Sequence, residues 1–256
     1  MKLNVNSPAY VLAFAAVTSS AFTAAIMALY AAGEPTARRS AALYEQRALV
    51  KLFGLQKDTA GRHVAGLVDS RIAGYRGPTA DPADLRREPI FLDDPQTGQR
   101  IPLLVAYRED LPADRKPDLR DRGRILGYAV PVSGVGFWAQ ITGYLAVSAD
   151  MEKVLGVVFL RHSETPGLGG RITEPAWREQ FRGLKITPPA KGDRFLYIGG
   201  QKPSGRDSPR AGRHVDAITG ATGTSTAVDK FLNDRIAQFR RAAEAAGLVK
   251  GGKPHG

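Results

Sequence analysis

Hydroxyl side chains and very small residues alternate in the segment HVDAITGATGTSTAV, which spans residues 214–228. Gly220 and Ala221 leave the hydroxyl of Thr222 unshielded, and an amphipathic helix is expected to follow from Ser225 to about Ala246. The first N–H groups of a helix lack partners inside the helix, and the positive end of its dipole lies there, so this position favours a phosphate group. A helix N-cap is the alternative interpretation, and three hydroxyls qualify for it: Thr222, Thr224 and Ser225.

A glycine-rich segment, SETPGLGGRI at residues 163–172, follows directly after an apolar run that predicts a strand. Glycine lets the backbone approach a flat or phosphate-bearing ligand closely, and consecutive N–H groups can form an anion-binding nest. The alternative is a glycine-rich turn without a ligand. This segment is therefore a second candidate for ligand binding.

The sequence contains none of the common motifs of enzymes that catalyse a reaction with their own side chains. It has no cysteine, which excludes disulfides, iron–sulfur ligation and thiol nucleophiles. Its four histidines show no metal-ligand spacing, and no phosphate-binding GxxxxGK(S/T), strand-borne GxGxxG or GxSxG motif occurs. We therefore expect no catalytic residue and no metal site of the chain's own.

The chain is basic, with 36 Lys and Arg against 25 Asp and Glu and a formal net charge of +11 at pH 7. The excess is spread over the whole length, without the dense basic block and interleaved aromatic residues that are typical of a nucleic-acid groove. A solvated basic surface explains this charge, and attraction to anionic lipid headgroups is the functional alternative. We therefore expect membrane lipid, and no nucleic acid, among the partners.

An apolar run, Pro8–Ala32, precedes the first acidic residue at Glu34. A helix of this length crosses a hydrocarbon layer of about 30 Å, which predicts a single transmembrane helix. A cleaved signal peptide, with Ala31-Ala32-Gly33 as its cleavage site, is the alternative, although the run exceeds the usual apolar core of about 7–15 residues. Small residues recur at every fourth position from Ala16 to Ala32, a spacing that favours docking against other membrane helices.

The remaining sequence predicts the α+β fold class, because strands and helices are segregated along the chain. Strands are predicted at five apolar, β-branched runs: 101–107, 125–132, 138–149, 153–162 and 194–198. Helices are expected at 35–58, at 175–182 and in the C-terminal segment, and the rest of 76–124 is expected to be surface loop. The predicted organisation is an N-terminal tail (1–7), a transmembrane helix (8–32), a membrane-proximal helical connector (33–75), one domain (76–250) and a C-terminal tail (251–256).

Together, the two candidate segments resemble the FMN-binding domain family. DAITGAT, residues 216–222, is similar to that family's covalent flavin-attachment motif, Asp-x-x-(Ser/Thr)-Gly-Ala-Thr. ETPGLGG, residues 164–170, is similar to its second hallmark, and the order and separation of the two motifs also match. The resemblance extends to the single N-terminal span and covers most of the chain, with 76–124 matched weakly.

This resemblance implies a covalent FMN, whose phosphate a separate flavin transferase joins to the hydroxyl of Thr222. Asp216 matches the acid of the motif and is expected to act during attachment. Three residues would shape the turn around the phosphate: Thr219, Gly220 and Ala221. Five others would line the isoalloxazine ring: Glu164, Thr165, Gly167, Leu168 and Gly169. The chain would then carry electrons, while its own groups orient and tune the flavin.

Further segments resemble the C subunit of the Na+-translocating NADH:quinone reductases. Gly136-Phe137-Trp138 and Gly143–Ala146 are similar to the Gly-Leu-Trp and Gly-Phe-Leu-Ala of that protein, and Glu174–Trp177 is similar to its Asn-Pro-x-Trp. Two residues depart from the pattern: Thr219 replaces the commoner Ser, and Arg171 stands where an acid is frequent. The implied role is to pass electrons from NADH toward ubiquinone, coupled to sodium export, beside other membrane subunits of the redox complex.

Two alternatives stay open. The same domain occurs in the G subunit of the related Rnf complex and would suit a free-standing flavin carrier. From a different class, the chain would be a non-redox, membrane-tethered binding module whose glycine turns are structural.

Charge and family resemblance point to opposite sides of the membrane. Four basic residues follow the span closely, so a positive-inside count alone places the domain in the cytoplasm. That rule weakens for long translocated domains, and the family's flavin-bearing domain lies outside the cytoplasm. We therefore expect a single-pass protein of the bacterial inner membrane with its large domain on the periplasmic side.

Overall fold

The computed structural model describes residues 7–55, 63–76, 84–190, 193–203, 205, 208 and 210–249. The chain forms two compact units, Met1–Tyr44 and Glu45–Gly256. The second unit combines helices with one large antiparallel sheet, which confirms the predicted α+β fold class. The second compact unit thus begins at Glu45, before residue 76, where the domain was expected to begin. The limits of the FMN-binding domain itself stay a prediction.

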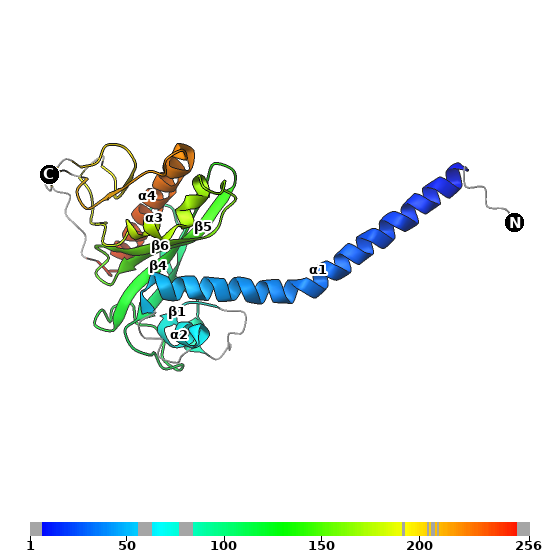
Figure 1. The fold of residues 1–256 in the computed structure, drawn as a ribbon. Coiled ribbons are helices and arrows are strands. Elements are labelled where there is room, and N and C mark those ends of the chain that lie inside the picture. Colours follow the sequence, from blue (N-terminus) through cyan, green and yellow to red (C-terminus); the bar gives the residue numbers. More distant parts are fainter. Residues whose placement is uncertain are drawn as a thin grey trace. The chain divides into compact units, whose positions relative to one another are not determined.

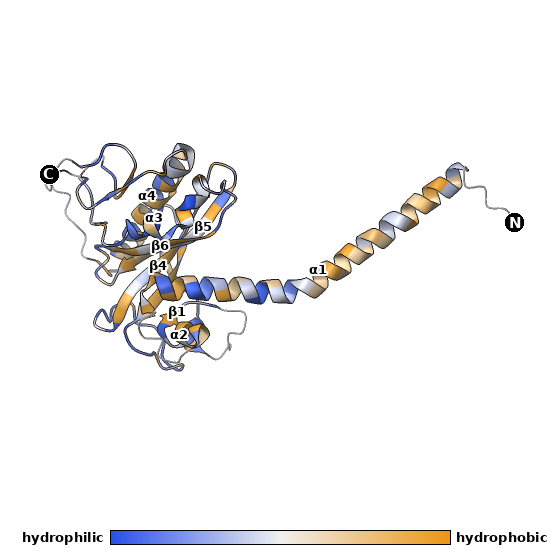
Figure 2. Ribbon diagram, in the orientation of Figure 1, coloured by the Kyte–Doolittle hydropathy of each residue, from blue (hydrophilic) through white to orange (hydrophobic). Residues whose placement is uncertain are grey.

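Helix α1 spans Pro8–Leu52 without interruption, so the predicted transmembrane helix and the first part of the connector form one element. Pro35 lies inside it, where its ring removes a backbone hydrogen-bond donor. The N-terminal part of α1 is long and apolar enough to cross a membrane, by length and composition, and none of that stretch is buried. Figure 2 shows apolar residues concentrated in this part of the helix.

Six strands build the large sheet: β1 (Ile72–Ala73), β2 (Ile90–Asp93), β3 (Arg100–Tyr107), β4 (Ile125–Val135), β5 (Gln140–Ser148) and β6 (Val154–Arg161). Their order is β1-β3-β4-β5-β6, β2 also pairs with β3, and all of these pairings are antiparallel. The strands predicted at 101–107, 125–132, 138–149 and 153–162 are confirmed. Strand β2 lies in the stretch where loop was expected.

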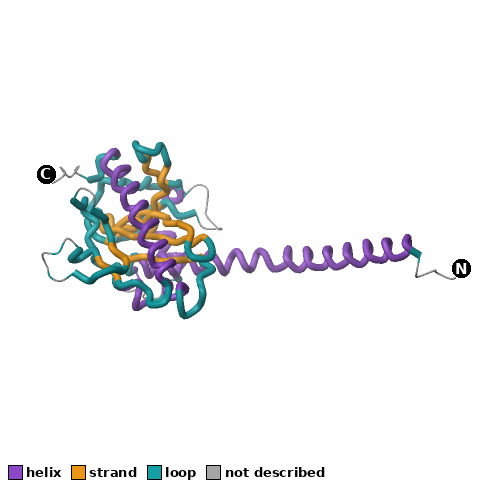
Figure 3. Tube along the Cα trace, turned by 90° about the horizontal axis from the view of Figure 1, so that it is seen from above, coloured by secondary structure: helices purple, strands orange, loops and turns teal. Residues whose placement is uncertain are grey.

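Helices cover both faces of the sheet (Figure 1; Figure 3). Helix α4 (Thr222–Ala245) packs on one face through an apolar stripe: Val228, Phe231, Leu232, Ile236 and Phe239. The last turns of α1 and helix α2 (Val64–Arg71) pack on the other face against a row of small side chains: Ala106, Ala129 and Ala146. Successive strand residues point to opposite faces, so Leu145 and Ala146 belong to different cores.

Helix α4 approaches strand β4 closely at Gly134. A Cβ atom there would lie 2.3 Å from Cδ1 of Phe231, so the ring needs glycine at this position. Just beyond, the N–H of Gly136 donates to the carbonyl of Ala139 at 2.8 Å and closes the β4–β5 hairpin. The first turns of α4 are thereby held beside this hairpin tip.

Polar side chains fix α4 along its length. The side chain of Asn233 both accepts from the N–H and donates to the carbonyl of Leu196, each at 3.0 Å. Near the C-terminus, Arg241 donates to the buried carboxylate of Asp94 at 3.1 and 2.7 Å. Arg240 donates to the carbonyl of Met151 at 2.8 Å.

Shorter elements complete the second unit. They are the 3-10 helices η2 (Leu85–Arg87) and η3 (Gly169–Thr173), helix α3 (Pro175–Glu179), and the parallel strand pair β7 (Tyr197–Ile198) and β8 (His214–Val215). The helix predicted at 175–182 and the strand predicted at 194–198 are therefore present but shorter than expected.

Candidate functional site

A tight turn precedes α4. The N–H of Ala221 donates to the carbonyl of Ile218 at 3.0 Å, and Gly220, at the third position, has a φ of +80°. A hydrogen-bonded turn with positive φ at this position is a type II turn, which favours glycine. A Cβ at Gly220 would also lie only 3.0 Å from Cδ2 of Leu168. Both conformation and space therefore require glycine here.

The alternative interpretation was that one of the three hydroxyls after the turn caps the helix, and none of them does so. The N-cap is Ala221, which makes no side-chain cap bond, and Thr222 begins the helix and is exposed. The hydroxyl of Ser225 accepts from the N–H of Ile218 at 3.0 Å, and that of Thr224 donates to Glu164 at 2.5 Å. The N-cap interpretation is wrong, because Thr224 and Ser225 hold the surrounding loops while Thr222 stays accessible.

A second type II turn faces the first. The N–H of Leu168 donates to the carbonyl of Thr165 at 3.1 Å, with Pro166 at the second position and Gly167, at φ +74°, at the third. A Cβ at Gly167 would meet no atom within 4 Å. Glycine is therefore needed at this position for its backbone conformation alone.

Glu164 ties three segments together although it is only 4% exposed. One carboxylate oxygen accepts from the N–H groups of Phe137 and Trp138 at 2.9 and 3.1 Å, and the other accepts from Thr224. A Cβ at Gly169 would lie 2.6 Å from the same carboxylate. A buried carboxylate needs such donors, and here they join the hairpin tip, the second turn and α4.

These segments enclose a pocket of about 290 Å³. Seven predicted residues line it: Glu164, Thr165, Leu168, Gly169, Gly220, Ala221 and Thr222. Four lining residues were not predicted: Phe137, Trp138, Gly223 and Thr224. The signal for Phe137 and Trp138 was the resemblance of Gly136-Phe137-Trp138 to the Gly-Leu-Trp of the C subunit.

The walls of this pocket suit a flat ring beside an anionic group. Phe137 and Trp138 are 63% and 67% exposed and pack edge to face, with ring centroids 5.0 Å apart. The indole N–H of Trp138 donates to the hydroxyl of Thr165 at 3.1 Å, and Leu168 adds an apolar side chain that is 44% exposed. The start of a long helix, with the free Thr222 hydroxyl, supplies the polar end. These residues fit the FMN that the flavin-attachment resemblance implies.

Gly167, Asp216 and Thr219 do not line this pocket. Asp216 and Thr219 line a neighbouring one of about 200 Å³, together with Arg171, Glu174 and Trp177 among others. The indole of Trp177 donates to the carbonyl of Asp216 at 2.8 Å, and the Asp216 carboxylate pairs with Lys202 at 3.0 Å. The backbone of Asp216 is thus fixed, while its carboxylate lies on the other side of the turn.

The comparisons with known proteins agree with this geometry. A family model described as an FMN-binding domain matches residues 136–237, which contain all of the pocket. The C subunit of the Na(+)-translocating NADH-quinone reductase of Pseudomonas aeruginosa is 30% identical over 241 residues, covering 85% of this chain and 87% of that protein. The chain belongs to this C-subunit family. The predicted resemblance to the FMN-binding domain family and to the C subunit is thereby confirmed.

Other members support the same family assignment. The corresponding protein of Chlamydia pneumoniae is 37% identical over 132 residues, which cover 48% of this chain and 41% of that protein. The crystal structure of Shewanella oneidensis NqrC superposes with a TM-score of 0.50 at 20% identity, covering 80% of this chain and 97% of that one. This last likeness shows that the two proteins share a fold.

Proposed function

We propose that this chain is the membrane-anchored, covalently flavinylated electron carrier of a Na+-translocating NADH:quinone reductase. The observation that carries the proposal is the pocket of about 290 Å³ in which the exposed Thr222 hydroxyl stands at the start of α4, opposite Leu168 and Trp138. FMN bound there would accept and pass on electrons.

Thr222 is the attachment residue in this proposal. Its hydroxyl oxygen becomes the ester oxygen of the FMN phosphate: the Oγ–P bond forms as the hydroxyl proton leaves, and the bond from the same phosphorus to a leaving group on the transferase's flavin donor breaks. The unpaired N–H groups of the first turn of α4 and the positive end of the helix dipole stabilise the phosphate charge. Gly220 and Ala221 present no bulky side chain beside this oxygen, so a transferase can reach it.

The ring-binding side of the pocket is held by Glu164. Its bonds to the hairpin backbone fix Phe137 and Trp138, and its bond to Thr224 fixes the start of α4 beside them. Trp138 and Leu168 provide apolar surface for the isoalloxazine, and Thr165 and Gly169 complete the wall. A rigid wall keeps the flavin oriented for electron transfer.

Asp216 has its role during attachment. It lies beyond the Ile218–Ala221 turn, outside the flavin pocket, and its half-exposed carboxylate is open to a second protein. Thr219 lies on that same side. Both would therefore contact the flavin transferase rather than the mature cofactor.

The remaining parts of the proposal concern location and partners. Helix α1 anchors the chain in the inner membrane, with the large unit on the periplasmic side, beside the other membrane subunits of the complex. Electrons pass from NADH toward ubiquinone, coupled to sodium export. Membership in the C-subunit family favours this complex over the Rnf alternative.

Mass spectrometry tests the proposal. The full chain, co-expressed with a flavin transferase, should exceed its sequence mass by one FMN less one water, and the peptide containing Thr222 should carry the addition. Flavin fluorescence should persist on a denaturing gel. An unmodified mass under these conditions contradicts the proposal and favours the non-redox binding module.

A further inference from the structure

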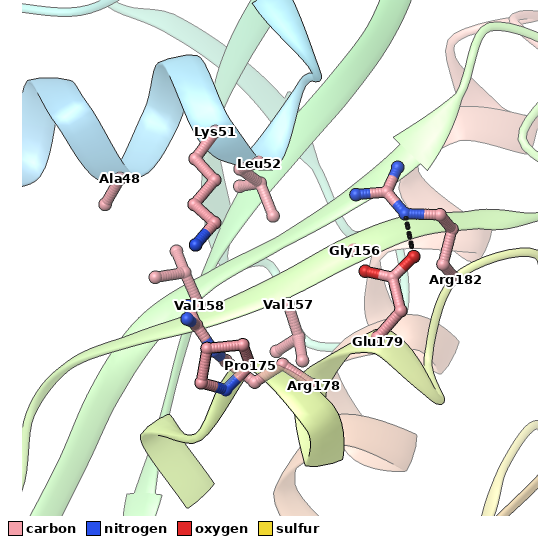
Figure 4. A pocket seen from close by; sticks show the side chains of 10 residues that line it. All are labelled: Ala48, Lys51, Leu52, Gly156, Val157, Val158, Pro175, Arg178, Glu179 and Arg182. Carbon is pink, nitrogen blue, oxygen red and sulfur yellow. Dashed lines mark hydrogen bonds and ion pairs between the residues drawn. The ribbon is translucent and has the colours of Figure 1, made fainter. Parts of the chain in front are cut away.

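A third, smaller pocket lies away from the flavin pocket, between the end of α1, strand β6 and helix α3 (Figure 4). Its volume is about 60 Å³. Apolar side chains and glycine form part of its lining: Ala48, Leu52, Gly156, Val157, Val158 and Pro175. All of these elements belong to the second compact unit.

Three cationic side chains line this pocket, against one carboxylate. Lys51 extends from α1 toward α3, where Arg178 lies, and Arg182 lies beside Glu179 (Figure 4). The Glu179 carboxylate accepts from Nε of Arg182 at 2.8 Å and is therefore already engaged. With three positive charges and one negative charge, the lining carries a formal charge of +2.

Lys51 and Arg178 have no carboxylate partner among the described residues. The Nε atom of Arg178 is buried and makes no hydrogen bond there. A buried donor without an acceptor costs free energy, and two cations that share a pocket repel each other. An anion between the two side chains would relieve this repulsion.

We propose that this pocket binds a phosphate group. A dianionic phosphate matches the formal charge of the lining, and its oxygens accept the several N–H donors that Lys51 and Arg178 offer. The small volume admits a headgroup-sized anion and no larger ring system.

The phosphate group can come from a soluble phosphorylated compound or from a phospholipid headgroup. The site shares no residue with the flavin pocket. Phosphate binding and flavin attachment can therefore fail independently of each other.

Isothermal titration calorimetry on the full chain in neutral detergent tests this site. Inorganic phosphate, titrated at constant ionic strength against a chloride control, should give saturable one-to-one binding. Lys51→Gln and Arg178→Gln should each weaken the affinity roughly tenfold or more, since each removes a charged donor. Arg115→Gln, an equal loss of charge at an exposed residue outside the pocket, should leave it unchanged.

A competition experiment separates the two sources. Short-chain phosphatidic acid or phosphatidylglycerol is added as a competitor, with phosphatidylcholine as control. If either anionic lipid displaces inorganic phosphate and phosphatidylcholine does not, the ligand is a lipid headgroup. Displacement by a soluble phosphomonoester alone identifies a free phosphorylated compound. The proposal is overturned if phosphate binding does not saturate, or if the affinity for phosphate is equal in the Lys51→Gln, Arg178→Gln and Arg115→Gln variants. Thermal unfolding of each variant without phosphate confirms that the fold is retained.

Discussion

The two ends of helix α4 are built on different principles. At the C-terminal end, Arg241 forms an ion pair with the buried Asp94, and Arg240 donates to backbone carbonyls of neighbouring segments. At the N-terminal end, the cap residue makes no side-chain bond and the first side chain, Thr222, is exposed. The C-terminal end of the helix is fixed by an ion pair, whereas at the N-terminal end Thr224 and Ser225 bond to neighbouring loops and the Thr222 hydroxyl alone stays accessible.

This difference indicates that stability and function are separated along one element. The C-terminal half can hold the helix on the sheet, so the Thr222 hydroxyl at the N-terminal end is not needed for capping. Functional positions often break local rules of stability that other parts of the structure compensate. Substitutions along α4 should therefore change stability most at one end and flavin attachment most at the other.

The largest loss of stability is expected from Asp94→Asn. Loss of the charge weakens both bonds from Arg241 and should lower the free energy of unfolding by about 2–3 kcal/mol at pH 7. Urea unfolding of the variant measures this loss, with the neighbouring, exposed Asp93→Asn as control. Flavin attachment at low temperature should be unaffected, and loss of flavin in a folded variant would break the proposed separation.

The same pair predicts a pH dependence. Hydrogen bonds from Arg241 hold the pKa of the Asp94 carboxyl well below its usual range, because they favour the charged form. Its folded pKa is below the unfolded value of about 3.9, so its stabilisation is present above that pH and is lost as the pH falls below it. The difference between wild type and Asp94→Asn should therefore shrink on acidification from pH 6 to pH 3. A constant difference would assign the effect to shape instead of charge.

A moderate loss of stability is expected from Thr224→Val. The change leaves one oxygen of the buried Glu164 without its donor, which should cost about 1–3 kcal/mol. Thr226→Val, at an exposed position of the same turn of the helix, is the matched control. Intact mass should still show attached flavin, because the Thr222 hydroxyl remains. Equal stability of the two variants would remove Glu164 from its proposed role.

The two turns offer a matched pair with a smaller effect. Gly220→Ala and Gly167→Ala both force alanine into positive φ, at about 1–2 kcal/mol each. Only at Gly220 does the new methyl group also meet Leu168. Gly220→Ala should therefore lose more stability and slow flavin attachment, whereas Gly167→Ala should only lose stability. Thermal unfolding and a time course of flavin incorporation distinguish the two, and identical behaviour would mean that space at Gly220 is not limiting.

The smallest effect on stability, and the largest on flavin, is expected at Thr222. Thr222→Val should stay within about 0.5 kcal/mol of wild type, because the side chain is exposed and caps nothing. It should abolish covalent flavin, and Thr222→Ser should retain it. Flavin remaining on Thr222→Val in peptide mass spectra would place the attachment on another residue.

The sequence predicted the elements better than their contacts. The runs at 125–162 alternate β-branched and small residues clearly enough to identify three strands and their hairpins, and α4 has a regular apolar stripe. Strand β2 was missed because it is short and lies among Pro, Asp and Arg. Its place is set by pairing with β3, which no local pattern contains.

The residues of the candidate site that lie in sequence motifs were predicted. The residues whose roles depend on contacts with distant parts of the chain were not. Thr222, Gly220 and Leu168 lie in the two glycine-rich segments and meet in one pocket. The role of Thr224 depends on Glu164, sixty positions earlier in the chain, and its local pattern suggested only a cap. Asp216 lies on the opposite side of the turn because the sequence does not specify in which direction that turn faces.

The bond between Glu164 and Thr224 also has a consequence for the order of events in the cell. Strands β4 to β6 are joined by short hairpins and can form early, but α4 must return across many residues before the pocket exists. A transferase that recognises Thr222 by its surroundings would meet those surroundings only on a chain whose last helix has docked. Flavin on this threonine would then mark each molecule that has completed folding, and chains that stall earlier would remain colourless.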